Sequence, residues 1–161
     1  MADDDKPLQR ARAVALRFLA DRARTEAQVR ARLARAELDA HADPVVAWLR
    51  DLGYLDDVAY ARALTAPGKL GPRAAERRLL SAGVAAGATR AAVTEALAEA
   101  PGGEVARCRV LAERRAQGAP LDGLDERTRA RLARFLLGRG FSGAAVQAAL
   151  GGFEDRSLDE P

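Results

Sequence analysis

Arginines at helical spacing are the residues of this chain best placed to do chemistry. Arg73 and Arg77 are four residues apart. Arg127, Arg131 and Arg134 follow one another at intervals of four and three. Side chains so spaced share one face of a helix, where guanidinium groups can bind phosphate oxygens in pairs. Such stripes indicate a surface that follows a polyanion, although a solvated face with interspersed acids has a similar composition. The candidate binding residues are Arg30, Arg35, Arg73, Arg77, Arg78, Arg127, Arg131 and Arg134.

Residues that would support catalysis are scarce. His41 is the only histidine and Cys108 the only cysteine, so neither has the partners that a metal site or a nucleophile–base pair requires. The adjacent carboxylates Asp56 and Asp57 are more typical of a helix N-terminus than of acid–base catalysis. The Gly-Lys within residues 67–72 lacks the spacing and the preceding strand of a phosphate-binding loop. The sequence therefore predicts no enzyme, no bound metal and no cofactor.

Charge is unevenly distributed along the chain. Among 161 residues, 26 Lys or Arg and 23 Asp or Glu give a net charge of +3, but acids crowd the two ends, 1–7 and 153–161. The body between them is basic, as expected of a protein that binds polyanions. Biased codon usage would produce the same excess of arginine, since only Lys6 and Lys69 are lysine. No apolar run is long enough to cross a membrane, and the acidic start is unlike a secretory signal, so we expect a cytoplasmic protein.

One helix-ending phrase occurs three times. Residues 33–38, 79–84 and 136–141 read Leu-Ala-Arg-Ala-Glu-Leu, Leu-Leu-Ser-Ala-Gly-Val and Leu-Leu-Gly-Arg-Gly-Phe. Gly83 and Gly140 stand where a helix must stop. A period of this size predicts helical units stacked along an axis, and no stretch has the alternation of a strand. We therefore predict an all-α protein of three tandem three-helix repeats, elongated and curved. Its predicted parts are an acidic tail (1–7), repeats at 8–57, 58–100 and 101–152, and a second acidic tail (153–161).

Capping residues set the expected helix starts. Thr25 and Gln28 form a capping box, and Pro72 opens a helix at its first turn. The first helix is expected over 8–23. The remaining starts are expected at Asp43-Pro44, Thr89 and Ser142.

Residues 53–57, Gly-Tyr-Leu-Asp-Asp, link the first unit to the second. Gly53 is expected to end a helix in the left-handed conformation. Tyr54 and Leu55 are expected to pack between units, and Asp56 or Asp57 to cap the next helix. Near the end of the chain, Gly140 and Ser142 play the same stop and start roles on either side of Phe141. All these positions are therefore assigned to structure.

Together these phrases resemble the RecX family. The resemblance covers about residues 10–151, and its most specific parts are Gly-Tyr-Leu-Asp-Asp (53–57) and Arg-Gly-Phe-Ser (139–142). It also includes residues 15–25, 29–33, 60–61, 71–73 and 78–84. Three places depart from the family pattern: Glu37 stands where the first repeat usually has Gly, and residues 41–43 and 85–88 lengthen two turns.

The resemblance implies a function without catalysis. RecX proteins lie in the groove of the RecA–DNA filament and modulate RecA, usually as inhibitors, in recombination, DNA repair and the SOS response. The implied partners are the RecA filament and single- or double-stranded DNA without sequence preference, bound by a monomer. Two alternatives stay open on the residues alone. A helical adaptor would use its arginines on an acidic protein. A sequence-specific regulator would need base-reading residues at a helix start, and these are sparse here.

Overall fold

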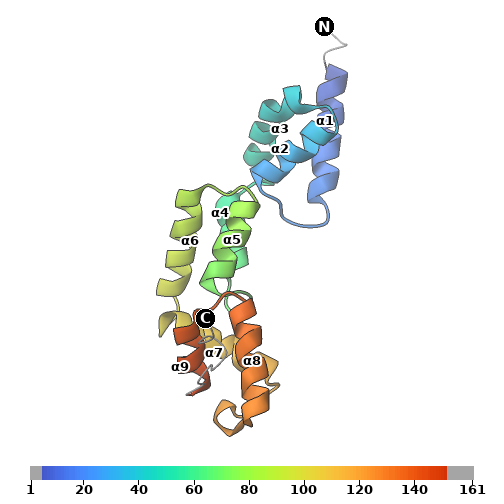
Figure 1. Ribbon diagram of the computed structural model, residues 1–161. Coiled ribbons are helices and arrows are strands. Elements are labelled where there is room, and N and C mark those ends of the chain that lie inside the picture. Colours follow the sequence, from blue (N-terminus) through green and yellow to red (C-terminus); the bar gives the residue numbers. More distant parts are fainter. Residues whose placement is uncertain (1–4, 152–161) are drawn as a thin grey trace, which may run out of the picture.

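Nine α-helices and two short 3-10 turns make up the part of the chain that the structure describes. This computed structural model covers residues 5–151, and no strand occurs within them. Helices contact one another in consecutive groups of three, and these units lie end to end in a long, bent row (Figure 1). The predicted all-α, elongated fold is confirmed. Unit 1 holds α1 (Asp5–Leu19), α2 (Glu26–Arg35) and α3 (Ala42–Asp51); unit 2 holds α4 (Asp57–Thr65), α5 (Pro72–Ser81) and α6 (Ala86–Ala98); unit 3 holds α7 (Gly103–Arg115), α8 (Glu126–Gly138) and α9 (Gly143–Leu150).

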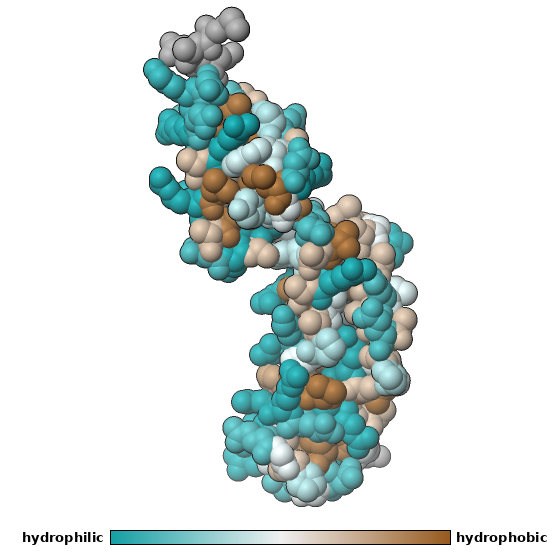
Figure 2. All heavy atoms as spheres, turned by 180° about the vertical axis from the view of Figure 1, so that it is seen from behind, coloured by the Kyte–Doolittle hydropathy of each residue, from teal (hydrophilic) through white to brown (hydrophobic). Residues whose placement is uncertain are grey.

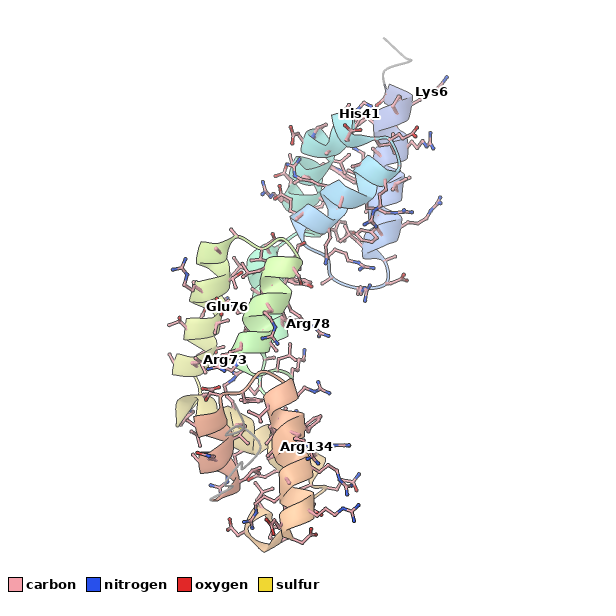
Figure 3. The ribbon with its side chains drawn as sticks, in the orientation of Figure 1. Lys6, His41, Arg73, Glu76, Arg78 and Arg134 are labelled. Carbon is pink, nitrogen blue, oxygen red and sulfur yellow. The ribbon has the colours of Figure 1, made fainter. Side chains whose placement is uncertain are left out.

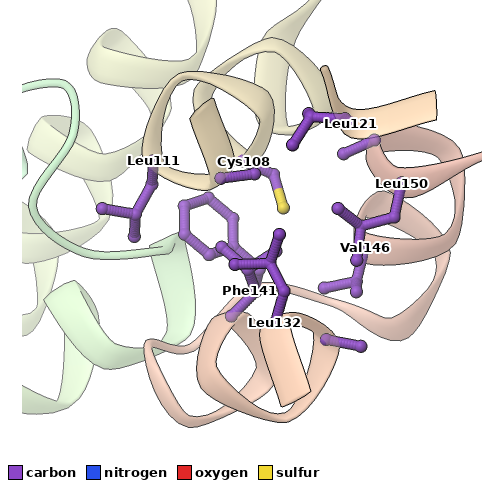
Figure 4. Packing of buried hydrophobic residues seen from close by; sticks show 11 residues of the cluster. Cys108, Leu111, Leu121, Leu132, Phe141, Val146 and Leu150 are labelled. Atoms are coloured by element: carbon purple, nitrogen blue, oxygen red, sulfur yellow. The ribbon is translucent and has the colours of Figure 1, made fainter. Parts of the chain in front are cut away.

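Each unit has an apolar core of its own. Leu33, Leu79 and Leu136, which occupy the same place in the three repeated phrases, are all 0% exposed. The core of unit 3 gathers around Cys108, Phe141 and neighbouring aliphatic side chains (Figure 4). Burial raises the pKa of the Cys108 thiol to about 12, with a further contribution from Glu104, so the thiol is neutral and acts as a small apolar residue. Seen from behind, the surface is mainly hydrophilic and its apolar patches are small and separated (Figure 2).

The middle helix of every unit ends in the same way. The second residue after the helix takes a left-handed conformation, at Glu37 (φ 58°), Gly83 (φ 82°) and Gly140 (φ 88°). The next amide then reaches back to the carbonyl of the buried leucine: Leu38 N–H to Leu33, Val84 N–H to Leu79 and Phe141 N–H to Leu136, at 3.0, 3.0 and 3.3 Å. This is a Schellman stop, which satisfies carbonyls that a helix end leaves free.

Neighbouring units meet through these stops. The carbonyls of Arg139 and Gly140, at the end of α8, accept hydrogen bonds from the amides of Gly71 (2.8 Å) and Arg73 (3.2 Å), at the start of α5. In the same manner the carbonyl of Ala82, at the end of α5, accepts from the Thr25 hydroxyl at the start of α2. The free carbonyls of one middle helix thus pair with donors at the start of the preceding one. We call the resulting head-to-tail row of α8, α5 and α2 the middle-helix column.

A buried arginine adds a second link between units 2 and 3. Arg107 on α7 is 6% exposed, and its guanidinium donates to the carbonyls of Thr65 and Ala96. Burial lowers its pKa, against the opposing influence of Glu99. Both acceptors belong to the last turns of α4 and α6, so the cation sits where helix dipoles favour it.

Close contact at the stops explains why glycine stands at 83 and 140 and another residue stands at 37. A Cβ on Gly83 would overlap the Cβ of Ala27, and one on Gly140 would overlap the backbone of Ala74. Both neighbours belong to the preceding unit. Glu37 is exposed and belongs to the first unit within residues 5–151, so only its backbone conformation is unfavourable. Glycine is therefore required at the second and third stops and dispensable at the first.

Replacing Glu37 by glycine is accordingly expected to stabilise the protein. The gain should be about 0.5–1 kcal/mol, because relief of the left-handed strain outweighs the greater chain entropy of glycine. Urea unfolding measures it, with Glu37→Gln as the control that removes the charge and keeps the strain. A gain in the Gln variant equal to that in the Gly variant would trace the effect to charge.

Several sequence predictions of helix ends are confirmed. Thr25 and Gln28 form the predicted capping box, and Pro72 lies in the first turn of α5. Gly53 is left-handed (φ 73°), and Ser142 caps α9 through the Ala145 amide.

Three predicted helix boundaries are wrong. The first helix runs over Asp5–Leu19, and the Arg24 side chain donates to the Phe18 carbonyl, one of those left free at its end. The third helix begins at Ala42 after a 3-10 turn (Asp39–His41), so Asp43 lies inside the first turn and is not its cap. The sixth begins at Ala86, and Thr89 is buried inside it, where its hydroxyl faces the Val84 carbonyl.

The link between units 1 and 2 also differs from expectation. Tyr54 is 58% exposed, because the chain turns outward after Gly53, whereas Leu55 is buried in the core of unit 1 rather than between units. Asp56 is the residue that caps α4, accepting from the Ala59 amide at 2.9 Å. Asp57 instead reaches the first amide of α2, where its carboxylate accepts from Glu26 N–H at 3.0 Å and joins the two units.

None of the helices within residues 5–151 is both long and apolar enough to span a bilayer.

Candidate nucleic-acid interface

An arginine-lined groove lies where units 2 and 3 meet. Its volume is about 590 Å³. Arg77 and Arg78 reach it from α5, and Arg139 reaches it from the end of α8. No carboxylate lines the groove, whose remaining walls are apolar, small or hydroxylic: Leu70, Ala74, Ser81 and Gly138. We call it the junction groove.

The electrostatics of the junction groove favour an anion. Arg77, Arg78 and Arg139 are exposed, and none of them has an ion pair within residues 5–151. Figure 3 shows Glu76 on the side of α5 that faces α6, and Arg78 on the opposite side. The acid nearest in sequence is thus turned away from the groove. Three unpaired guanidinium groups so placed can bind successive phosphates.

Further arginines extend this basic surface along α8. Arg127, Arg131 and Arg134 are exposed and without ion pairs in the described part of the chain. In Figure 3, Arg134 projects from α8 on the same side of the molecule as Arg78 projects from α5. The two helices belong to the middle-helix column, whose backbone hydrogen bonds fix one helix relative to the other. A ligand bound in the junction groove can therefore continue along unit 3.

Other members of the predicted set lie elsewhere. Arg73 does not line the groove; its amide binds the Gly140 carbonyl, and it lies at the unit 3 end of α5 (Figure 3). Arg30 is engaged by Asp43 (2.6 Å) and Glu26 (2.9 Å), whose hydrogen bonds raise its pKa, so a phosphate would have to displace two carboxylates. Arg35 is exposed in the last turn of α2, away from the groove.

Sequence reasoning missed Arg139. It is not on the helical stripe of Arg127, Arg131 and Arg134, because it is the C-cap of α8, and it faces the groove only because α8 meets α5 there. One signal could have found it: Arg139 directly precedes Gly140, a helix stop that forms a contact between units.

The residues considered for catalysis have structural positions. Asp56 caps a helix, Asp57 joins two units, and Cys108 is buried. His41 lies in the 3-10 turn before α3. Within residues 5–151, no three His, Cys, Asp or Glu side chains gather as a metal site would require.

Comparisons with known proteins agree with this arrangement. Residues 11–49 match the family model described as the first three-helix domain of RecX, and residues 103–150 match the third three-helix domain. Relatives named regulatory protein RecX in two strains of Thermus thermophilus are 36% identical over 139 residues, which cover 84% of this chain and 87% of theirs. These relatives carry the name of a regulatory protein and not that of an enzyme.

Solved structures share the fold. The crystal structure of RecX from Lactobacillus salivarius superposes with a TM-score of 0.65 at 20% identity, covering 93% of this chain and 96% of that one. A second crystal structure, of a regulatory protein RecX, gives 0.63 at 21% identity over 89% of this chain and 73% of the other. The matched domains, the extent of the sequence identity and the shared architecture agree, and the chain belongs to the RecX family.

Proposed function

We propose that this protein binds the RecA filament on DNA in the cytoplasm and reduces RecA activity, and so acts in recombination, DNA repair and the SOS response. Membership of the RecX family supports RecA as the partner. The elongated row of units supports a long binding partner, because stacked units present an extended surface. In this proposal the protein acts as a monomer, with each unit contacting the filament.

The observation that carries the proposal is the junction groove. It draws Arg77 and Arg78 from one unit and Arg139 from the next, with no carboxylate among its lining residues. Phosphates are the anions that a nucleoprotein filament offers in a row, and guanidinium groups bind them without reading sequence. We therefore expect contact with DNA of any sequence, through Arg77, Arg78, Arg139 and the exposed arginines of α8.

A titration of RecA's DNA-dependent ATPase tests the function. RecA is assembled on single-stranded DNA, and ATP hydrolysis is followed as this protein is added. We expect hydrolysis to fall as the protein saturates the filament, and we expect the protein to sediment with filaments. Salt-dependent sedimentation with DNA alone would separate a DNA contact from an adaptor that binds only an acidic protein. Unchanged hydrolysis together with no sedimentation on filaments would rule out the RecA role.

A further inference from the structure

A second cavity in unit 3 lies beside α8 and has a different character. It is formed between the end of α7 and the first half of α8 and has a volume of about 270 Å³. Leu124, Leu132 and the ring of Phe135 give it apolar walls, and Ala119 lies in its lining. Arg115 and Arg131 also line it, and no carboxylate does. We call it the α7–α8 pocket.

One arginine of the pocket and one arginine of the junction groove contact the same ring, that of Phe135. The guanidinium of Arg139, which lines the groove, lies 5.0 Å from the centre of that ring. The guanidinium of Arg115, which lines the pocket, lies 5.3 Å from it. Phe135 itself lines the pocket. A ligand whose anionic part lies in the groove can therefore place an attached group in the pocket.

We propose that the α7–α8 pocket accepts one unpaired base of a DNA strand whose phosphates lie in the junction groove. This inference rests on the proposed DNA contact. A base is the planar, largely apolar group that is joined to every phosphate of a strand, and it stacks on aromatic rings and on guanidinium planes alike. The Arg115 guanidinium, which lies over the Phe135 ring, provides such a plane beside the apolar wall of the pocket, and Arg131 at the pocket can bind the next phosphate.

The charge of the two cavities favours a nucleotide over a peptide side chain. A peptide that filled the α7–α8 pocket with an apolar residue would also have to supply acids to three separate arginines in the groove. A single strand supplies both parts from one repeating unit. Because a duplex would first have to unpair a base, the pocket gives this chain a preference for single strands.

Two variants test the pocket, and the second of them leaves every lining residue of the junction groove and the Arg139–Phe135 contact in place. Phe135→Leu keeps an apolar side chain and removes the ring. Ala119→Leu starts from an exposed residue and narrows the cavity without disturbing the core. Ala91→Leu, on an exposed part of α6, adds the same volume outside the pocket and serves as the control. Binding is measured for oligo(dT) and for an oligonucleotide of equal length and charge that carries abasic sites.

The wild type should bind oligo(dT) about tenfold more tightly than the abasic strand, the value expected for one stacked base. Both pocket variants should lose that difference, and Ala119→Leu should bind the abasic strand as the wild type does, whereas Ala91→Leu should keep the difference. Equal affinity of the wild type for the two strands would overturn the proposal, as would retention of the difference in both pocket variants. An acidic, leucine-containing peptide that binds the wild type but not Ala119→Leu, with no difference between strands, would assign the pocket to a protein instead. Failure to bind either strand would overturn the DNA contact itself.

Discussion

Gly140→Ala is expected to destabilise the protein by about 3 kcal/mol. The backbone at Gly140 is left-handed (φ 88°), which costs an alanine roughly 1–2 kcal/mol. The new methyl would also lie 2.5 Å from the Cβ of Ala74 in the preceding unit, and overpacking of this kind costs about 1–3 kcal/mol. For a chain of this length the melting temperature should fall by about 10 °C. Thermal unfolding followed by circular dichroism measures the change.

Gly138→Ala is the matched control. Gly138 is helical, lies two residues away and has open space where a methyl would stand, so this variant should be neutral or slightly more stable. If both variants lost a similar amount of stability, the close contact between α8 and α5 at residue 140 would not be the cause of the loss.

The triple variant Arg77→Ala, Arg78→Ala, Arg139→Ala is expected to weaken DNA binding and to reduce its dependence on salt. If each guanidinium neutralises one phosphate, the slope of log affinity against log salt should fall by about 2 on single strands. Alanine is a good helix former, so α5 should remain intact. Fluorescence anisotropy with a labelled oligonucleotide across a salt series measures the slope, and inhibition of RecA's ATPase should weaken in parallel.

A variant with the same change in charge separates the junction groove from net charge. Arg10, Arg17 and Arg90 are exposed, carry no ion pairs within residues 5–151 and do not line the groove. Replacing all three by alanine should leave most of the salt dependence in place. If the two triple variants lost affinity to the same degree, binding would follow the overall charge, and the junction groove would have no special part in it.

Local signals predicted the helices and their stops well. The three repeated phrases placed the apolar residues at the helix ends and the glycine stops at 83 and 140, because a Schellman stop depends on a few neighbouring residues, whereas the left-handed Glu37 was not predicted. Starts with a capping side chain were also found, as at Thr25 and Ser142. The start of α6 was missed, because Ala85 offers no capping side chain, and Thr89 resembled a cap only by residue type.

Contacts between units could not be predicted from the sequence. The Gly71 amide and the Arg139 carbonyl are far apart in the chain, and both groups belong to the backbone, so no side-chain pattern marks their pairing. The direction of exposed side chains depends on the same contacts. For this reason the arginine stripes were found on the correct helices, while the junction groove, with Arg139 in it and Arg73 outside it, became visible only in the assembled fold.

The middle-helix column has a consequence for the order in which the units become stable. The start of α2 has a capping box of its own, Thr25 and Gln28, and takes one further cap, on the Glu26 amide, from Asp57 of unit 2, so unit 1 supplies most of what this helix start needs. The start of α5 has Gly71 and no capping side chain, and two of its amides are satisfied only by carbonyls of unit 3. Unit 2 therefore reaches full stability only after unit 3 has folded, even though unit 2 is synthesised before unit 3. A chain that ended after α6 would leave these two amides to water, and we expect its central unit to be less stable than in the full chain.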